Sequence, residues 1–243
     1  MTELRVIPVE GLPEVSEGAK LGELIAARAE LQNGDVVVIS QKVVSKAEGM
    51  VRRLAEVEPS ARAIELANKL DKDPALVELI LNESQEILRE DRVLITETHH
   101  GFVCANAGID TSNLPEQGTV CLLPEDPDAS ARRIRTELTT RVAVVIADSF
   151  GRAWRVGQAE VAIGCAGLAP LDDWRGREDA HGRELTATSI AIADQVASAA
   201  DLVRVKDSGI PAAIVRGLDR YVAAEDGPGA AALRRPPAED LFR

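Results

Sequence analysis

The chain has 243 residues, of which 45% are hydrophobic, enough to bury a full core in one large domain or two small ones. Aromatic residues make up 2%, so we expect a core of Ala, Val, Ile and Leu. The formal net charge of −12 argues against a nucleic-acid partner, and no apolar run approaches the ~20 residues that span a membrane.

The N-terminus and the cysteines predict a cytoplasmic protein. Charged Glu3 and Arg5 interrupt the first residues, and no apolar signal-peptide segment follows them. Cys104, Cys121 and Cys165 are odd in number and form no C-x-x-C pattern, which favours reduced thiols over disulfides or structural zinc.

Strand-like apolar runs alternate with helical patterns along the chain. The predicted strands cover residues 4–9, 35–39, 92–96, 119–123, 142–147 and 212–215. The predicted helices cover residues 19–31, 61–70, 74–88, 128–138 and 190–203. Asp73 is the expected cap of the third helix, and Pro74 its first residue.

Two segments fit these patterns less clearly. Residues 160–169 are rich in Ala and Gly, which allow close packing as either a strand or a helix, and we expect a helix there. Residues 219–243 are rich in Ala, Gly and Pro and are interpreted as a C-terminal arm or linker after a domain of residues 1–218. The alternation predicts a mixed α/β or α+β fold, and the chain has no P-loop or G-x-G-x-x-G motif.

The segment DSFGRAWRVGQ, residues 148–158, follows the predicted strand 142–147 directly. Asp148 and Ser149 form a pair of hard-oxygen groups that suits a metal ion, and Arg152 and Arg155 suit phosphate or carboxylate oxygens. The alternative is an Asp-Ser turn with solvated arginines, or a surface ion pair of these arginines with Glu160.

Two further segments carry polar groups after predicted strands. GIDTSN, residues 108–113, contributes the single acid Asp110 from a Gly-rich and Asn-rich loop. SQKVVSKAEG, residues 40–49, places Lys42, Lys46 and two hydroxyls where they could meet phosphate or a carboxylate. The ordinary alternative for Asp110 and Asp148 is a capping or turn role. For His99, His100 and His181 we expect hydrogen bonding rather than catalysis or metal binding.

Together with the opening VIPVEGLPE, residues 6–14, these segments closely resemble the coenzyme F420-0:L-glutamate ligase family, in order and over nearly the whole chain. The resemblance implies an unusual α+β fold of two interlocked subdomains, and a homodimer. It also implies Mg²⁺ or Mn²⁺, with two ions expected and K⁺ as a further candidate. The implied metal ligands are Asp110, Asp148, Ser149 and Glu184. For Glu184, a simple acidic role near the following helix is the alternative.

The resemblance further implies which residues surround the nucleotide: Leu12, Pro13, Glu14, Gln41, Lys46 and Asn113. Some relatives have Ser at the position of Gln41, and many have Thr at that of Ser149. Lys42, Arg152 and Arg155, together with Lys46, are the candidates for the remaining positive charge at the reacting groups.

The implied activity is GTP-dependent addition of L-glutamate to coenzyme F420-0 through an acyl phosphate, giving F420-1 and longer γ-glutamyl tails. The alternatives are another metal- and nucleotide-dependent carboxylate–amine ligase, a phosphohydrolase, or a non-catalytic deazaflavin-binding protein. Some relatives carry a C-terminal flavin domain after a segment like residues 234–243. Because this chain stops at Arg243, we expect it to hold no flavin.

Overall fold

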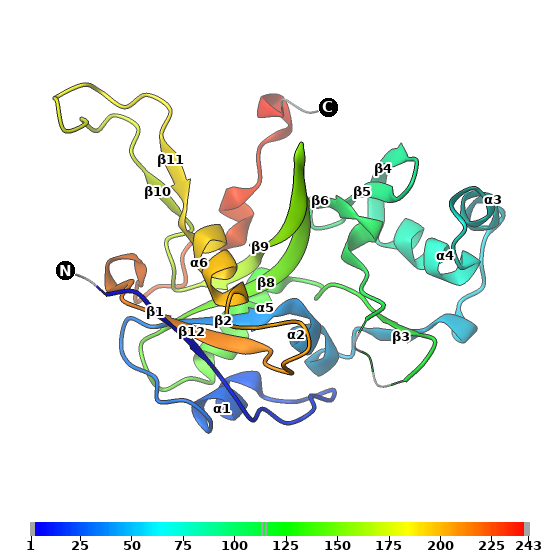
Figure 1. The fold of residues 1–243 in the computed structure, drawn as a ribbon, viewed down its shortest axis with the longest axis horizontal. Coiled ribbons are helices and arrows are strands. Elements are labelled where there is room, and N and C mark those ends of the chain that lie inside the picture. Colours follow the sequence, from blue (N-terminus) through cyan, green and yellow to red (C-terminus); the bar gives the residue numbers. More distant parts are fainter. Residues whose placement is uncertain (1–2, 113, 115, 241–243) are drawn as a thin grey trace.

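The structure is a computed structural model, which describes residues 3–112, 114 and 116–240. A five-stranded sheet forms its centre (Figure 1). The strands lie in the order β1 (Arg5–Pro8), β12 (Ala212–Arg216), β2 (Val36–Ser40), β8 (Ala143–Arg152) and β9 (Arg155–Ala166). Strands β2 and β8 run parallel, and the other neighbouring pairs run antiparallel.

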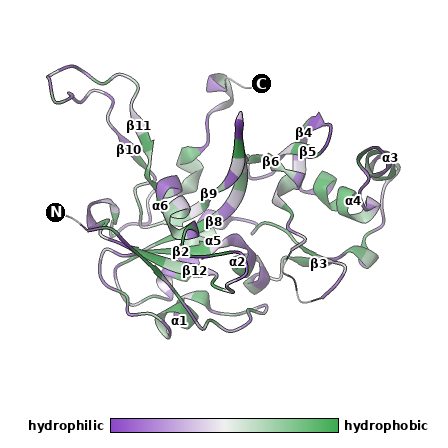
Figure 2. Ribbon diagram, in the orientation of Figure 1, coloured by the Kyte–Doolittle hydropathy of each residue, from purple (hydrophilic) through white to green (hydrophobic). Residues whose placement is uncertain are grey.

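Both faces of this sheet are covered. Alternate strand residues point to opposite faces, so Val37 and Ile39 pack on one side while Val36 and Val38 pack on the other. The first side is covered by α1 (Leu21–Ala26), α2 (Gln41–Ala47) and α5 (Pro127–Thr136). The second is covered by α6 (Ile192–Asp201). A strand buried on both faces must be apolar throughout, which explains the Val-rich runs, green in Figure 2.

A second, smaller core lies beside the sheet, at the right of Figure 1. Leu66, Ile80 and Leu94 are buried in it. It is built from α3 (Ala61–Leu70), α4 (Pro74–Asn82) and the three-stranded sheet of β4 (Ser84–Glu90), β5 (Leu94–Thr98) and β6 (Val103–Ala105). Asp73 caps α4 by accepting hydrogen bonds from the backbone N–H groups of Ala75 and Leu76, which confirms the predicted cap.

Two strand pairs and several short helices complete the structure. Strands β3 (Val51–Arg53) and β7 (Thr119–Cys121) pair antiparallel, and β10 (Leu171–Asp173) and β11 (Ser189–Ala191) form the base of an arm at the upper left of Figure 1. The 3₁₀ helices are η1 (Leu54–Glu56), η2 (Asn106–Gly108), η3 (Asp219–Tyr221), η4 (Ala230–Leu233) and η5 (Pro237–Glu239).

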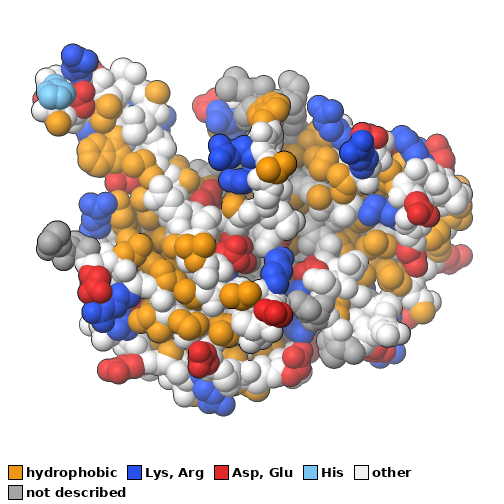
Figure 3. Space-filling model, in the orientation of Figure 1, with side chains coloured by type: hydrophobic (Ala, Val, Ile, Leu, Met, Phe, Trp, Pro, Cys, Tyr) orange, Lys and Arg blue, Asp and Glu red, His pale blue; other side chains and the backbone are white. Residues whose placement is uncertain are grey.

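This arrangement confirms the predicted α+β class. The boundary at residue 218 and the interlocked subdomains stay predictions. Beyond that boundary, Val222 and Ala230 are buried against the second face of the central sheet. In the part of the chain that the structure describes, no helix is long and apolar enough to cross a membrane. On the face drawn in Figure 3, acidic and basic side chains are interspersed.

The helix predicted at residues 160–169 is wrong, because most of this segment belongs to strand β9. Its small residues allow helix α5 to pack closely on the strand. A Cβ added to Gly164 would lie 2.3 Å from the carbonyl oxygen of Pro127, the first residue of α5. The Ala and Gly content therefore reflects a tight helix–sheet contact rather than a helix.

Three other predicted boundaries shift. The helix predicted at 74–88 ends at Asn82, and residues 84–90 form β4, which pairs with β5. The helix predicted at 19–31 is reduced to the short α1. The strand predicted at 142–147 continues as β8 to Arg152 and pairs with β9, so residues 148–158 belong to a β-hairpin and not to an Asp-Ser turn.

Candidate active site

A cavity of about 700 Å³ opens at one edge of the central sheet. It is bounded by the end of β2 and start of α2, the base of the β8–β9 hairpin, residues 104–112, and residues 201–211, which comprise the last residue of α6 and the loop that follows it (the loop 201–211). Most of the residues singled out from the sequence line it: Leu12, Pro13, Glu14, Gln41, Lys42, Lys46, Asp110, Asp148 and Ser149.

The parallel pairing of β2 with β8 explains why distant motifs meet there. Ser40, the last residue of β2, lies opposite Ala147 of β8. Gln41 follows Ser40, and Asp148 follows Ala147. Both residues must therefore lie at the same edge of the sheet. Gln41 is buried, and its amide donates hydrogen bonds to Ser45 Oγ at 2.7 Å and Leu122 O at 2.9 Å, which fixes the start of α2.

Lys42 and Lys46 are four residues apart in α2, so they lie on one face of the helix, toward the cavity. Each is paired with a carboxylate. Lys42 Nζ lies 2.8 Å from Asp110 Oδ2, and Lys46 Nζ lies 2.6 Å from Glu14 Oε1. The helix thus brings two ammonium groups into a cavity of an otherwise acidic protein.

Asp110 is held in place by its backbone and by donors to its side chain. Its backbone N–H and C=O exchange hydrogen bonds with Cys121 of β7, at 3.0 and 2.8 Å. Burial opposes ionisation of its carboxyl, but hydrogen bonds from Lys42 and from the N–H and hydroxyl of Ser112 outweigh burial and lower the pKa below its usual range. Asp110 is therefore a carboxylate at neutral pH.

Asp148 has the opposite environment. The pKa of its carboxyl is raised to about 7, chiefly by burial and to a lesser extent by the nearby charges of Asp110 and Glu160. A hydrogen bond from the Ser149 backbone N–H and the positive charge of Lys206 act against this rise. Among the described residues, no Lys or Arg forms an ion pair with Asp148. A half-buried acid with a raised pKa and no ion-pair partner is in an environment that favours a bound cation.

The cavity residues fit a hard divalent cation. No group of three or more His, Cys, Asp and Glu in the described ranges could hold a metal ion alone. Mg²⁺ and Mn²⁺, however, are often bound by one or two carboxylates and complete their coordination with water and substrate phosphates. Asp110 and Asp148 supply carboxylates of that kind and Ser149 a hydroxyl, and the carboxylates of Glu14, Glu160, Asp201 and Asp207 line the same cavity.

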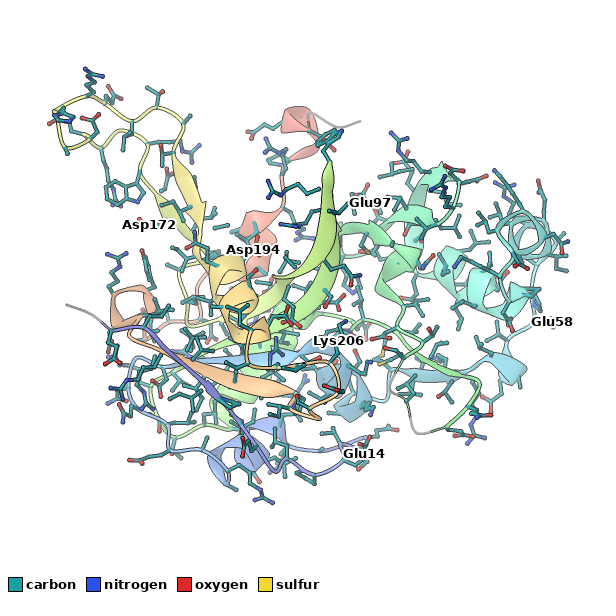
Figure 4. All side chains as sticks on the ribbon, in the orientation of Figure 1. Glu14, Glu58, Glu97, Asp172, Asp194 and Lys206 are labelled. Atoms are coloured by element: carbon teal, nitrogen blue, oxygen red, sulfur yellow. The ribbon has the colours of Figure 1, made fainter. Side chains whose placement is uncertain are left out.

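The loop 201–211 adds residues that the sequence analysis missed: Asp201, Arg204 and Lys206, which line the cavity with Glu160 of β9. Arg204 is buried; its guanidinium donates to the Glu160 carboxylate and, at 3.3 Å, to Pro211 O at the other end of the loop. Lys206, labelled in Figure 4, lies on this loop below α6. The only sequence signal was two cations before a Ser-Gly turn at the end of an apolar helix.

Three predicted residues lie away from the cavity. Arg152 and Arg155 flank the turn of the β8–β9 hairpin, and the Arg152 guanidinium donates to Val156 O at 2.8 Å and Gly157 O at 3.2 Å. Glu184 is exposed in the β10–β11 arm, where its backbone forms an isolated antiparallel β-bridge with the backbone of Glu178. The ion-pair partner of Glu160 is Arg204 and not a hairpin arginine. Asn113 falls outside the described residues.

The histidines and cysteines have no nucleophilic arrangement. Nε2 of His99 is hydrogen-bonded to Asn82 O at 2.8 Å, and Nε2 of His100 to Pro124 O at 2.9 Å, as expected. All three cysteines are buried and free. Burial raises the pKa of Cys104 and Cys165 to about 12, so neither is a thiolate near neutral pH.

The chain is similar to a family of known ligases. Residues 11–217 match the family described as F420-0:Gamma-glutamyl ligase. Proteins named "Coenzyme F420:L-glutamate ligase" from Methanopyrus kandleri and Methanothermobacter thermautotrophicus are 48% and 45% identical to it, each over 99% of this chain and 98% and 99% of their own. The protein of that name from Haloarcula marismortui is 41% identical over 99% of this chain and 96% of its own.

Proposed function

Because the chain belongs to the F420-0:gamma-glutamyl ligase family, we propose that this enzyme is a ligase that adds L-glutamate to coenzyme F420-0. We propose that GTP drives the reaction and that F420-1 and longer γ-glutamyl tails are its products. One observation carries the proposal: two acids, Asp110 and Asp148, and two lysines, Lys42 and Lys46, meet in one cavity of this chain.

Amide formation from a carboxylate and an amine is unfavourable in water, so the carboxyl must first be activated. In the proposed reaction, the carboxylate of F420-0 attacks the γ-phosphorus of GTP and releases GDP, forming an acyl phosphate. The amine of glutamate then attacks the acyl carbon, the C–O bond to phosphate breaks, and the amine loses a proton. Phosphate leaves, and the new amide remains.

The cavity residues have defined roles in this proposal. Phosphoryl transfer depends on positioning and on positive charge around the phosphate oxygens. Lys42, Lys46 and Lys206 are ammonium groups at the cavity wall that can bind those oxygens. Asp110, Asp148 and Ser149 would hold Mg²⁺ or Mn²⁺, as one or two ions, and a bound divalent ion supplies further charge neutralisation between phosphate oxygens. K⁺ stays a further candidate ion.

The remaining expectations belong to the same proposal. Leu12, Pro13, Glu14, Gln41 and Asn113 are proposed to surround the nucleotide, and Arg152, Arg155 and Glu184 keep their proposed roles as clamps and as a ligand. We also propose a cytoplasmic homodimer. Trp154 and Val156 at the hairpin turn have exposed fractions of 81% and 95%, and a contact between subunits would cover such apolar side chains.

Mass spectrometry of F420-0 incubated with GTP, Mn²⁺ and L-glutamate tests the function. We expect products heavier by one or more glutamyl units, with GDP and phosphate released in step. Reactions without GTP, or with ATP in its place, measure nucleotide dependence. Release of GDP without glutamyl addition would instead indicate a phosphohydrolase or another acceptor acid. Binding of F420-0 with no GDP formed under any condition would indicate a non-catalytic deazaflavin-binding protein.

A further inference from the structure

Lys42 is held by three acceptors at the cavity wall. Its ammonium group lies 2.8 Å from Asp110 Oδ2, 2.6 Å from the backbone oxygen of Ser112 and 3.2 Å from the Ser112 hydroxyl. An ammonium group has three N–H donors, so each donor has an acceptor. The exposed fraction of the Lys42 side chain is 15%. Lys42 is thus bound to Asp110 and Ser112 rather than extended freely into the cavity.

The two oxygens of Asp110 are used differently. Oδ1 accepts hydrogen bonds from the backbone N–H of Ser112 at 2.7 Å and from its hydroxyl at 2.8 Å. Oδ2 is the oxygen that faces Lys42. A metal ion bound to Asp110 would therefore use Oδ2, the same oxygen that the ammonium group contacts. Two cations on one carboxylate oxygen repel each other, so Lys42 and a divalent ion compete there.

Asp110 and Asp148 therefore differ before any ligand binds. Asp110 is already neutralised by an internal cation, whereas Asp148 has no ion-pair partner among the residues described. Of the two candidate ligand carboxylates, a divalent ion that enters the cavity finds that of Asp148 available and that of Asp110 occupied by Lys42. Lysine is suited to such an exchange, because its ammonium group sits on a flexible chain and can move between anions.

We propose that Lys42 is an exchangeable counter-ion of Asp110, which the nucleotide phosphates draw away so that Oδ2 becomes available to the divalent ion. This inference rests on the proposed function, because it assumes that phosphate oxygens and a metal bind in this cavity. It adds an order to their binding. Without nucleotide the site holds the metal weakly, and with nucleotide each ligand strengthens the other by the same factor, as linkage requires.

Lys46 provides a matched control within the same helix. It lies one turn from Lys42, lines the same cavity and is also paired with a carboxylate. Its partner, Glu14, is not among the candidate metal ligands, and the Glu14 side chain is 70% exposed. Removing the Lys46 charge therefore changes the local positive charge by the same amount as removing the Lys42 charge, without freeing an oxygen of Asp110.

The test is a measurement of Mn²⁺ affinity by electron paramagnetic resonance of free Mn²⁺, with and without a non-hydrolysable GTP analogue. In nucleotide-free protein we expect Lys42→Met to bind Mn²⁺ about tenfold tighter than wild type, and Lys46→Met to bind it about as wild type does. The analogue should tighten Mn²⁺ binding about tenfold in wild type and clearly less in Lys42→Met. Lys42→Arg keeps a cation at this position, so its affinity for Mn²⁺ without nucleotide should stay as low as that of wild type. Circular dichroism confirms that each variant is folded.

Equal or weaker Mn²⁺ binding by nucleotide-free Lys42→Met would overturn the inference, as would equal tightening by Lys46→Met. Either result leaves the proposed function standing, because glutamyl addition is measured separately. Should neither wild type nor any variant bind Mn²⁺, even with the analogue present, both the inference and the proposed metal ligands would be wrong.

Discussion

At the scale of single residues, Asp110 and Asp148 are two acids of one cavity with opposite protonation behaviour. Hydrogen bonds from Lys42 and Ser112 keep Asp110 ionised, whereas burial favours the protonated form of Asp148. An acid that is partly buried without an ion-pair partner destabilises a fold when it is ionised, and such positions are often retained for function. Asp148 is therefore the residue whose replacement separates activity from stability.

Replacing Asp148 by Asn should reduce glutamyl addition by at least about a hundredfold and leave the fold intact, since loss of a residue that only supports a metal ligand already lowers metal affinity or activity by about 10- to 100-fold. The measurement is steady-state turnover at several Mn²⁺ concentrations. Asp194→Asn is the control, because Asp194 is a half-buried acid that accepts the Ala162 N–H outside the cavity. Near wild-type activity of Asp148→Asn at low metal would refute the assignment.

The same residue predicts how the stability of metal-free protein depends on pH. The pKa of Asp148 is about 7 in the fold against an ordinary value of 3.8, so the folded state keeps a proton that the unfolded chain releases between these pH values. Its contribution to the free energy of unfolding is full below about pH 4 and is lost as pH rises to about 7, by ~2 to 4 kcal/mol.

Thermal unfolding of the protein with a chelator, at several values between pH 4.5 and 8, measures this pH dependence of stability. Asp148→Asn should flatten the pH dependence and raise the melting temperature at pH 7.5 by a few degrees. Glu160 and Asp194, whose pKa values burial also raises, contribute in the same direction, so the comparison is between wild type and variant. An unchanged pH dependence in Asp148→Asn would show that its carboxyl titrates normally.

Motifs identified individual site residues better than they identified their partners. Asp148 and the lysines of residues 40–49 could be found because each follows an apolar run of β2 or β8, whose parallel pairing brings polar groups to one edge. Asp110 follows η2 and bridges to Cys121 of β7, so it was found as the single acid of a Gly-rich segment and through the family resemblance. Arg204 and Lys206 could not, because a cation after a helix is common in sequences. Only the fold shows that Arg204 is buried against Glu160, 44 residues away.

At the scale of elements, the loop 201–211 forms part of the cavity wall and is held chiefly by Arg204. The Arg204 guanidinium joins the Glu160 carboxylate on β9 to the carbonyl of Pro211, which also accepts the Ser40 N–H at 2.8 Å. Residues 205–209 are exposed and bury little apolar surface of their own. The position of Lys206 therefore depends on this buried ion pair.

Glu160→Gln should accordingly raise the KM for GTP about tenfold with a smaller change in kcat, because the loop loses its anchor. The control is Asp35→Asn. Asp35 is also a buried acid paired with an arginine, Arg216, at 2.8 Å, but that pair does not line the cavity. Both variants should lose up to about 3 kcal/mol of stability, since each leaves an arginine without its carboxylate. A raised KM in both would mean that general destabilisation is the cause.

The sequence predicted strands more reliably than helices. Runs such as residues 142–147 are apolar on both faces and could only be buried. The hairpin formed by residues 148–158 and the strand at 160–166 depend on pairing between β8 and β9 and on contact with α5, and neither leaves a periodic pattern. Residues 84–90 are similar, since their strand form comes from pairing with β5.

At the scale of the whole molecule, charge and composition predicted the general character of the surface and core. Ala, Val, Ile and Leu do form the two large clusters around the sheet, as the low aromatic content predicted. The net charge of −12 makes cavity cations necessary for any anionic substrate. The residues at the hairpin turn, Trp154 and Val156, are the clearest exposed apolar pair.

If the homodimer forms through the hairpin turn, the double variant Trp154→Lys, Val156→Lys should shift the molar mass in light scattering from dimer to monomer, because charge there opposes burial. Ile64→Lys is the control, since Ile64 is an apolar residue that is 45% exposed on α3 and lies outside the hairpin turn. A monomeric wild type, or a variant that remains dimeric, would exclude this surface as the contact.

The two cores described above also bear on how the protein opens. Asp110 follows Ile109, which packs on the smaller core, while Asp148 belongs to a strand of the central sheet. Cores of different size commonly form separate cooperative units with separate opening free energies. Amide hydrogen exchange should then be faster in α3 and α4 than in β2 and β8. A ligand that contacts both acids would link the opening of the two units and slow amide exchange in the smaller one. Its binding free energy would then stabilise helices far from the cavity.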